Sequence, residues 1–211
     1  DRLVSNFSLV MGVAGATAGQ EGVLLAGLAG LLAGALSMAL GEWISVKSSQ
    51  ELYENQMQIE MEELETHPEN EMKELELIYK AKGIPAEQAK EMAAEIIRNP
   101  EHAHELLVKE ELGINAEELK GSAFEAALYS FILFAIGAII PVFPFMFLSG
   151  INAILLSTAA SAVGLFIIGA AITLFTGKSL WFSGFRQVIF GLAAAAITFG
   201  IGKLIGFSVA G

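Results

Sequence analysis

Four glutamates occur as two pairs in a stretch of the chain that is rich in acidic residues. Glu60 and Glu63 form the first pair, Glu71 and Glu74 form the second, and the sequence His67-Pro68 separates them. Positions three apart share one face of a helix, so each pair can present two carboxylates to one cation. Like charges at this spacing repel unless a cation lies among them, so the pattern fits either an ion-binding site or a solvated acidic surface. The same segment contains further glutamates that produce this spacing by chance, namely Glu62, Glu65 and Glu69.

Two residues upstream could bind or pass a cation within an apolar segment. Met38 offers a thioether, which is a soft ligand suited to transition metals, although a methionine in such a segment also serves ordinary packing. Glu42 follows four residues later on the same helical face. Ionisable groups inside a membrane tend to mark an ion path, whereas a glutamate near a helix end can reach the interface instead. Both interpretations of each residue stay open on sequence alone.

The histidines and the remaining motifs favour no enzymatic chemistry. Glu101-His102-Ala103-His104 contains the Glu-x-x-His spacing of di-iron bundles, but such bundles need a second copy on another helix. We therefore expect His67, His102 and His104 to be exposed or to act as auxiliary ligands. No phosphate-binding glycine loop and no Ser/His/Asp set is evident, so we expect a protein that is not an enzyme.

Composition places these residues in a membrane protein with one acidic aqueous insert. The chain has 211 residues, 54% of them hydrophobic, and its mean hydropathy of +0.59 lies far above that of a soluble domain. Residues 47–121 carry 19 Glu against 8 Lys and Arg, whereas the other residues carry 4 acidic and 4 basic groups. Such an insert repels nucleic acid and attracts cations. The chain has no cysteine, which leaves carboxylate, imidazole and thioether as ligands.

Hydrophobic periodicity predicts an all-α polytopic membrane protein in three parts. Residues 1–46 contain part of a first transmembrane helix, which we expect to be truncated at its N-terminus, and a second one over Val23–Val46 with a Gly30-x-x-x-Gly34 face that lets another backbone approach closely. This second helix continues without a break into the acidic helix of Gln50–Glu65. Residues 47–121 form the insert, and residues 122–211 hold three more spans. The predicted insert helices lie near 69–82, 86–98 and 101–112, and the predicted spans cover 122–148, 152–176 and 185–208.

Charge bias sets the expected orientation of these five spans. The predicted turn after the fourth span carries Lys178 and Arg186, two of the few cations outside the insert. Positive residues favour the cytoplasmic side of a membrane. Two spans separate this turn from the insert, so both face the cytoplasm.

The chain resembles the vacuolar iron transporter family. The matching stretches lie in the same order along nearly the whole chain: Asp1-Arg2-Leu3-Val4, Gly12-Val13-Ala14-Gly15-Ala16, Ala35-Leu36-Ser37-Met38-Ala39-Leu40-Gly41-Glu42-Trp43, Glu110-Glu111-Leu112-Gly113 and Pro141-Val142-Phe143-Pro144-Phe145. The resemblance implies five spans with a Glu-rich helical domain between the second and third. It also implies a homodimer in a vacuolar-type membrane or a prokaryotic cell membrane that moves Fe²⁺ out of the cytoplasm, typically against protons.

The resemblance also assigns expected roles to particular residues. Asp1 and Met38 match the family's intramembrane aspartate and methionine, which face a pore between the two subunits. The expected ligands of the cytoplasmic metal-binding domain are Glu60, Glu63, Glu71, Glu74 and Glu111.

Two departures from the family pattern affect what the resemblance implies. The family often has a Met pair before its last Glu, where this chain has Leu107 and Val108, so the insert site is expected to be carboxylate alone, with His104 or Glu105 as possible neighbours. A carboxylate site leaves Mn²⁺ open beside Fe²⁺, with Zn²⁺ and Co²⁺ as further candidates. Arg2 stands where the family usually has Gly, and it could pair with Asp1 or block it.

These expectations combine into one hypothesis and one alternative from another class. The hypothesis is a dimeric divalent-metal/proton antiporter whose inserts collect the ion and pass it by Glu42 to a site made by Asp1 and Met38. The expected partners are divalent metal ions, protons, membrane lipid and a second copy of the chain, with no resident cofactor. The alternative is a membrane-anchored metal buffer or sensor without transport.

Overall fold

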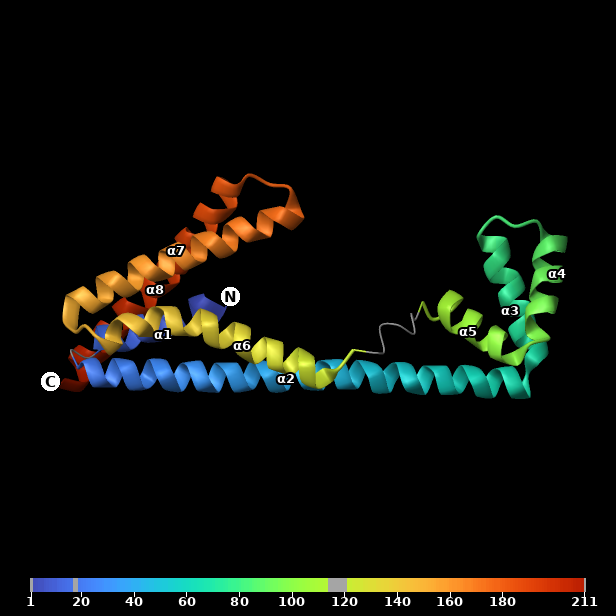
Figure 1. Ribbon diagram of the computed structural model, residues 1–211, viewed down its shortest axis with the longest axis horizontal. Coiled ribbons are helices and arrows are strands. Elements are labelled where there is room, and N and C mark those ends of the chain that lie inside the picture. Colours follow the sequence, from blue (N-terminus) through green and yellow to red (C-terminus); the bar gives the residue numbers. More distant parts are fainter. Residues whose placement is uncertain (1, 17–18, 114–120, 211) are drawn as a thin grey trace. The chain divides into compact units, whose positions relative to one another are not determined.

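Every regular element that the structure describes is a helix, as predicted from the hydrophobic periodicity (Figure 1). The computed structural model describes residues 2–16, 19–113 and 121–210. Two compact units result: a membrane unit of Asp1–Gly41 with Ala127–Gly211, and an insert unit of Glu42–Ala126. The elements are α1 (Arg2–Ala16), α2 (Gln20–Thr66), α3 (Pro68–Ala81), α4 (Ala86–Ile97), α5 (Pro100–Glu110), α6 (Ala123–Val142), the 3₁₀ turn η2 (Phe143–Met146), α7 (Gly150–Thr176) and α8 (Leu180–Ala210).

Four helices in the described ranges are long and apolar enough to cross a membrane. They are α2, α6 with η2, α7 and α8. The predicted continuity of the second span with the acidic helix is confirmed, because α2 is one helix of 47 residues. The fifth expected span corresponds to α1, which is apolar but has only 15 residues, fewer than the ~20 that cross the hydrocarbon. An all-α polytopic membrane protein is therefore confirmed.

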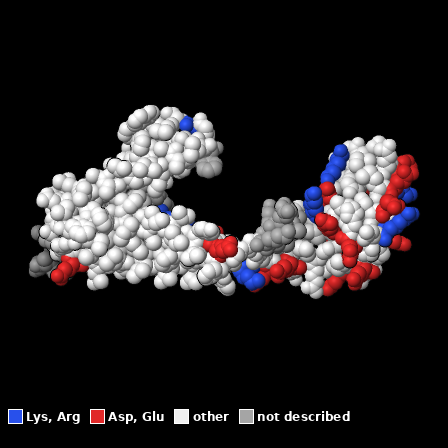
Figure 2. All heavy atoms as spheres, in the orientation of Figure 1, with Lys and Arg blue, Asp and Glu red and all other residues white. Residues whose placement is uncertain are grey.

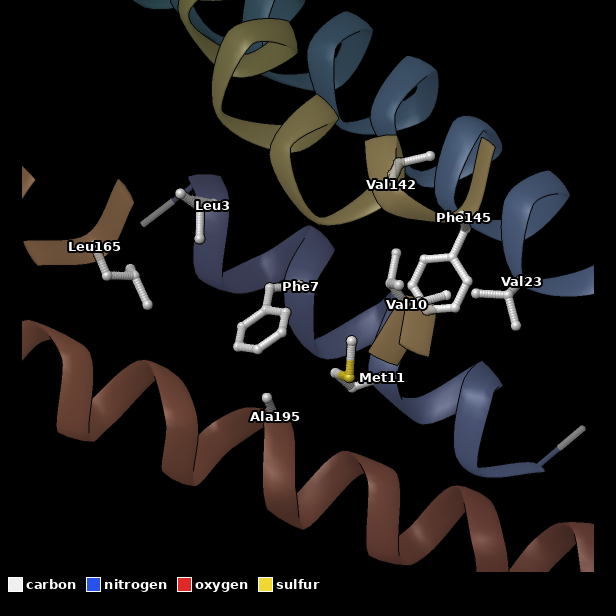
Figure 3. Packing of buried hydrophobic residues seen from close by; sticks show 10 residues of the cluster. Leu3, Phe7, Val10, Met11, Val23, Val142, Phe145, Leu165 and Ala195 are labelled. Atoms are coloured by element: carbon white, nitrogen blue, oxygen red, sulfur yellow. The ribbon is translucent and has the colours of Figure 1, made fainter. Parts of the chain in front are cut away.

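The core of the membrane unit forms around α1. Leu3, Phe7 and Val10 of α1 are fully buried and pack against residues of α2, α6, α7 and α8 (Figure 3). Apolar residues on several sides of this short helix explain its burial, since a helix that is apolar all round must be enclosed. Val142 and Phe145, at the end of α6 and in η2, belong to the same cluster.

The closest helix contact in the membrane unit joins α1 to α8 through glycines. A Cβ placed on Gly15 would overlap the backbone carbonyl of Phe199, and a Cβ on Gly202 or Gly206 would overlap the carbonyl of Gly12 or Ala16. Small residues allow such close approach of backbones in membrane helices. The predicted close backbone approach at Gly30 and Gly34 is not seen among the nearest atoms, which belong to side chains: Leu9 and Asn6 lie against Gly30, and the ring of Phe134 lies against Gly34.

A buried amide ties three helices of the membrane unit together. Asn6 of α1 is 2% exposed, and its Nδ2 donates to the carbonyl of Ala138 in α6 at 2.7 Å and to that of Gly27 in α2 at 3.3 Å. Ser157 of α7 similarly donates to the carbonyl of Pro141 at 2.7 Å, close to the proline that ends the regular part of α6. These polar contacts fix α1, α2, α6 and α7 relative to one another within the unit.

The last helix begins earlier than its predicted start at residue 185. α8 starts at Leu180, and the backbone N–H of Ser183 already donates to the carbonyl of Ser179. The connection to α7 is therefore short, with Gly177 in the left-handed conformation that ends α7. Apolar Leu180, Trp181 and Phe182 continue the helical pattern. Arg186 consequently lies on the helix and not in the turn.

The insert unit has a small apolar core of its own. α3, α4 and α5 pack with the acidic end of α2 around residues that include Leu64, Leu75 and Leu107. The ring nitrogen Nε2 of His104 lies 2.8 Å from the carbonyl oxygen of Met57, which ties α5 to α2. An ion pair between Lys82 and Glu110 joins the end of α3 to the end of α5. The unit includes the whole of the predicted insert 47–121.

Candidate metal centre

Three carboxylates from three helices meet in the insert unit. Glu60 comes from α2, Glu71 from α3, and Glu111 caps the C-terminal end of α5. One oxygen from each lies within 4.8 Å of the others. This separation is compatible with three oxygens around a single divalent cation, because metal–oxygen distances of 2.0 to 2.6 Å place the oxygens roughly 3 to 5 Å apart.

The local fold explains why these carboxylates point inward. Each lies one helical turn from a leucine of the insert core: Leu64 follows Glu60 by four residues, Leu75 follows Glu71 by four, and Leu107 precedes Glu111 by four. Residues four apart share a face of a helix. The leucines pack together and therefore bring the three glutamates to one point.

This leucine spacing is the sequence signal that separates the three glutamates from their neighbours. Glu62, Glu65 and Glu69 have no core leucine one turn away and are exposed. Figure 2 shows acidic side chains spread over the surface of the insert unit, whereas the membrane unit shows few charges. Most of the acidic residues therefore belong to a solvated surface, and the cluster is a small subset of them.

Burial distinguishes two of the three carboxylates from ordinary surface glutamates. Glu60 is 3% exposed and Glu71 is 4% exposed. One oxygen of each is buried without a hydrogen-bond partner among the described residues. A buried carboxylate without partners is costly. A cation at this point would supply the missing partner.

Burial is also the main cause of the raised pKa values in the cluster. Burial, followed by the charges of Glu111 and Glu71, raises the pKa of Glu60 to about 8. Burial also raises the pKa of Glu71 and of Glu111, with the neighbouring carboxylates adding to the effect. A hydrogen bond from Glu60 partly offsets the rise at both. Without a metal, the raised pKa values favour a proton shared within the cluster.

The other two expected ligands of the insert lie at the edge of this cluster. Glu63 and Glu74 are exposed and are not among the three that meet. Their charges nonetheless reach the cluster: both raise the pKa of Glu71 and of Glu111. The charge of His67 acts in the opposite direction on Glu71. Glu63 and Glu74 thus contribute negative potential around the three central carboxylates.

The positions expected to supply neighbouring ligands do not contribute side chains to the cluster. Leu107 is fully buried and Val108 is 3% exposed. Leu107 belongs to the apolar core. His104 is engaged with the carbonyl of Met57, and Glu105 is exposed. Among the described His and acidic residues, the group close enough to hold one ion is therefore made of carboxylates alone.

The residues expected to line the transport pathway do not form a site in the described part of this single chain. Met38 is 38% exposed on α2, and Glu42 is exposed one turn later. Asp1 lies outside the described residues. Nη2 of Arg2, in α1, donates to Oγ of Ser130, in α6, at 3.5 Å.

Comparison with known proteins gives a consistent result over almost the whole chain. A family model described as the VIT family matches residues 1–203. Vacuolar iron transporter 1 of Oryza sativa subsp. japonica is 32% identical over 206 residues, which cover 97% of this chain and 81% of that protein. Vacuolar iron transporter 1 of Arabidopsis thaliana is 32% identical over 206 residues, which cover 97% of this chain and 82% of that protein.

A relative from outside the plants matches over a similar length. The vacuolar iron transporter of Acanthamoeba castellanii is 36% identical over 208 residues, covering 96% of this chain and 76% of that protein. Together with the family model, these matches confirm the family inferred from the sequence motifs. The chain, with its apolar helices and its cluster of three carboxylates, belongs to the VIT family.

Proposed function

We propose that this chain transports divalent metal ions, Fe²⁺ first among them, out of the cytoplasm, and that the insert captures the ion on Glu60, Glu71 and Glu111. The observation that carries the proposal is the meeting of three carboxylate oxygens within 4.8 Å, two of them from buried residues. Membership of the VIT family and the names of the relatives support iron as the cargo. The long apolar helices support transport across a membrane.

The chemistry of the ligands limits which metals the insert can take. Carboxylate oxygens suit Mn²⁺, Fe²⁺ and other hard or borderline cations, whereas soft thiolate or thioether sites select other metals. We therefore propose that the insert accepts Mn²⁺ as well as Fe²⁺, with Zn²⁺ and Co²⁺ as weaker candidates. Selection against Mg²⁺ and Ca²⁺ is then left to the thioether of Met38.

Exchange for protons follows from the same carboxylates. A metal and a proton compete for one oxygen, so metal binding releases protons and protonation releases the metal. In the proposed path the ion leaves the insert, passes Glu42 and reaches Asp1 and Met38 of two copies of the chain. The exposure of Met38 supports a site shared between two copies, because a second subunit could supply the missing ligands.

Flux into proteoliposomes tests the proposal. The full chain is reconstituted with an acidic lumen, and entry of Fe²⁺ or Mn²⁺ is followed with a trapped metal-sensitive dye. We expect flux that needs the pH gradient, that falls in Glu60→Gln and Met38→Ala, and that persists in Glu62→Gln, which changes an exposed glutamate of the same helix. Flux that survives both Met38→Ala and collapse of the gradient would refute the mechanism.

The alternative of a membrane-anchored metal buffer or sensor predicts a different pair of results. In that case Glu60→Gln weakens metal binding by the purified chain, but no metal crosses the bilayer in either the parent or the variant. Binding alone therefore fits both functions, and transmembrane flux separates them.

A further inference from the structure

The first part of α8 presents an aromatic face away from the membrane unit. Six residues line a shallow groove of about 470 Å³ on it: Trp181, Phe182, Phe185, Arg186, Ile189 and Phe190. They recur four and eight residues apart and so share one side of the helix. Trp181 is 65% exposed and Phe190 is 68% exposed. On a helix that spans a membrane, apolar side chains exposed to this degree face lipid.

Packing against α7 at one edge of this face fixes its direction. A Cβ on Gly184 would overlap the ring of Phe166 in α7, so α7 and α8 lie in close contact there. The rings of Trp181 and Phe185 lie 5.6 and 5.5 Å from that of Phe166, centroid to centroid. The aromatic groove is therefore a fixed outer surface of the unit.

The groove combines this apolar surface with positive charge. The guanidinium of Arg186 lies over the ring of Phe182 at 5.8 Å, and Lys178 precedes the helix. The ion pairs among the described residues all lie in α2–α5 or at their ends, and none includes Arg186 or Lys178. Within the described part of the membrane unit the one acidic residue is Glu21, at the start of α2. A counter-charge must therefore come from another source.

The position of Arg186 makes a phosphate the suitable counter-charge. The residue lies six positions after the start of α8, which is about 9 Å along the helix axis. A guanidinium at the edge of the hydrocarbon is costly unless it is paired. Its planar fork matches a phosphate with two parallel hydrogen bonds. A second copy of the chain is a poor occupant, because a two-fold interface centred here would bring like charges together.

We propose that this groove, the α8 groove, is a binding site for an anionic phospholipid. The phosphate of the lipid pairs with Arg186, with Lys178 adding positive potential, and an acyl chain lies along Phe185, Ile189 and Phe190. Trp181 then marks the level of the headgroups, where amphipathic aromatic rings accumulate in membrane proteins.

Quenching of Trp181 fluorescence tests this site directly. The chain has 2 Trp, so Trp43→Phe leaves Trp181 as the only tryptophan, which is excited selectively at long wavelength. The full chain is reconstituted in phosphatidylcholine vesicles. A varied fraction of the lipid is replaced by a brominated one, in one series brominated phosphatidylglycerol and in the other brominated phosphatidylcholine, with the bromine in the acyl chains. We expect brominated phosphatidylglycerol to associate about fivefold more strongly, the size of effect expected from one cation near an anionic headgroup.

Three variants and one competitor make the result specific. Arg186→Gln should abolish the preference while leaving quenching by brominated phosphatidylcholine unchanged, which shows that the face still meets lipid. Arg186→Lys should retain part of the preference, and Lys203→Gln, a cation elsewhere on α8, should retain all of it. Free inorganic phosphate should not compete, because the acyl chain contributes to binding. Equal quenching by the two lipids, an unchanged preference in Arg186→Gln, or a failure of both lipids to quench would overturn the proposal.

Discussion

In the absence of a bound metal, the carboxylate cluster should make the insert less stable as pH rises. Burial raises the pKa of Glu60 from 4.5 to about 8, so the folded insert holds a proton that the unfolded chain gives up. Stability from a raised pKa is complete below the unfolded value and is lost as pH rises through the folded one. We therefore expect the metal-free insert to lose stability between about pH 4.5 and pH 8. A divalent metal should replace the proton and restore the stability of the insert.

The size of this effect follows from the shift. A rise in pKa from 4.5 to about 8 corresponds to about 5 kcal/mol between the two protonation states. This figure is a ceiling, because water entering the cluster would screen the charges. If about 2 kcal/mol of this effect remains after screening, the unfolding midpoint of a unit of this size should fall by roughly 10 °C as the pH rises through this range.

Thermal melts of the purified full chain measure the effect. Circular dichroism at 222 nm follows the loss of helix at pH 5.5 and pH 8.5, with and without Mn²⁺. We expect the unfolding midpoint of the insert to be lower at pH 8.5 than at pH 5.5 in the parent chain. The decrease should be smaller in Glu60→Gln and unchanged in the exposed control Glu62→Gln. Mn²⁺ should raise the midpoint of the parent at pH 8.5 more than at pH 5.5.

Two results would refute this reasoning. A parent midpoint that does not change between the two pH values would mean that burial and mutual repulsion do not raise the pKa values of the cluster. An equal fall in the parent and in Glu60→Gln would mean that other groups cause the pH dependence.

Three further predictions concern single residues. Glu71→Gln should weaken Mn²⁺ binding to the purified chain by about tenfold or more, because it removes one of three charged ligands, whereas the exposed control Glu69→Gln should not; calorimetric titration measures both. Asn6→Leu should destabilise the membrane unit by about 1 to 3 kcal/mol through loss of its buried hydrogen bonds, seen as a lower midpoint for loss of monodisperse protein on heating. Gly202→Ala should lower the same midpoint because its Cβ overlaps a backbone carbonyl of α1, whereas Gly200→Ala, which meets nothing within 4 Å, should leave it unchanged.

Helix positions could be predicted well from the sequence, because long apolar runs and proline breaks are local signals. The absence of any proline or glycine-rich break after Val46 predicts the continuity of α2, and Pro68 and Pro100 lie at the starts of α3 and α5. The start of α8 was predicted too late. Its first turns contain Ser183 and Gly184, which weaken an apolar pattern but are needed for close packing against α7.

The candidate site could be predicted only in part. Spacing along one helix pairs Glu60 with Glu63, whereas the fold pairs Glu60 with Glu71 and Glu111. Spacing along one helix cannot predict which glutamates of other helices lie nearby, because that depends on which side of each helix faces the core. That side is set by Leu64, Leu75 and Leu107. The family resemblance included Glu111 but could not rank the five glutamates, since ranking requires their burial.

The glycine contact between α1 and α8 also limits how the sequence of this chain can evolve. Most packed interfaces tolerate a larger residue on one side when a neighbour opposite becomes smaller. At Gly15, Gly202 and Gly206 the atoms opposite are backbone carbonyls, which no substitution can shrink. A second-site change therefore cannot compensate for a side chain added at these positions. Such sites should stay glycine while the surrounding apolar residues exchange freely, which makes them markers for aligning distant members of the family.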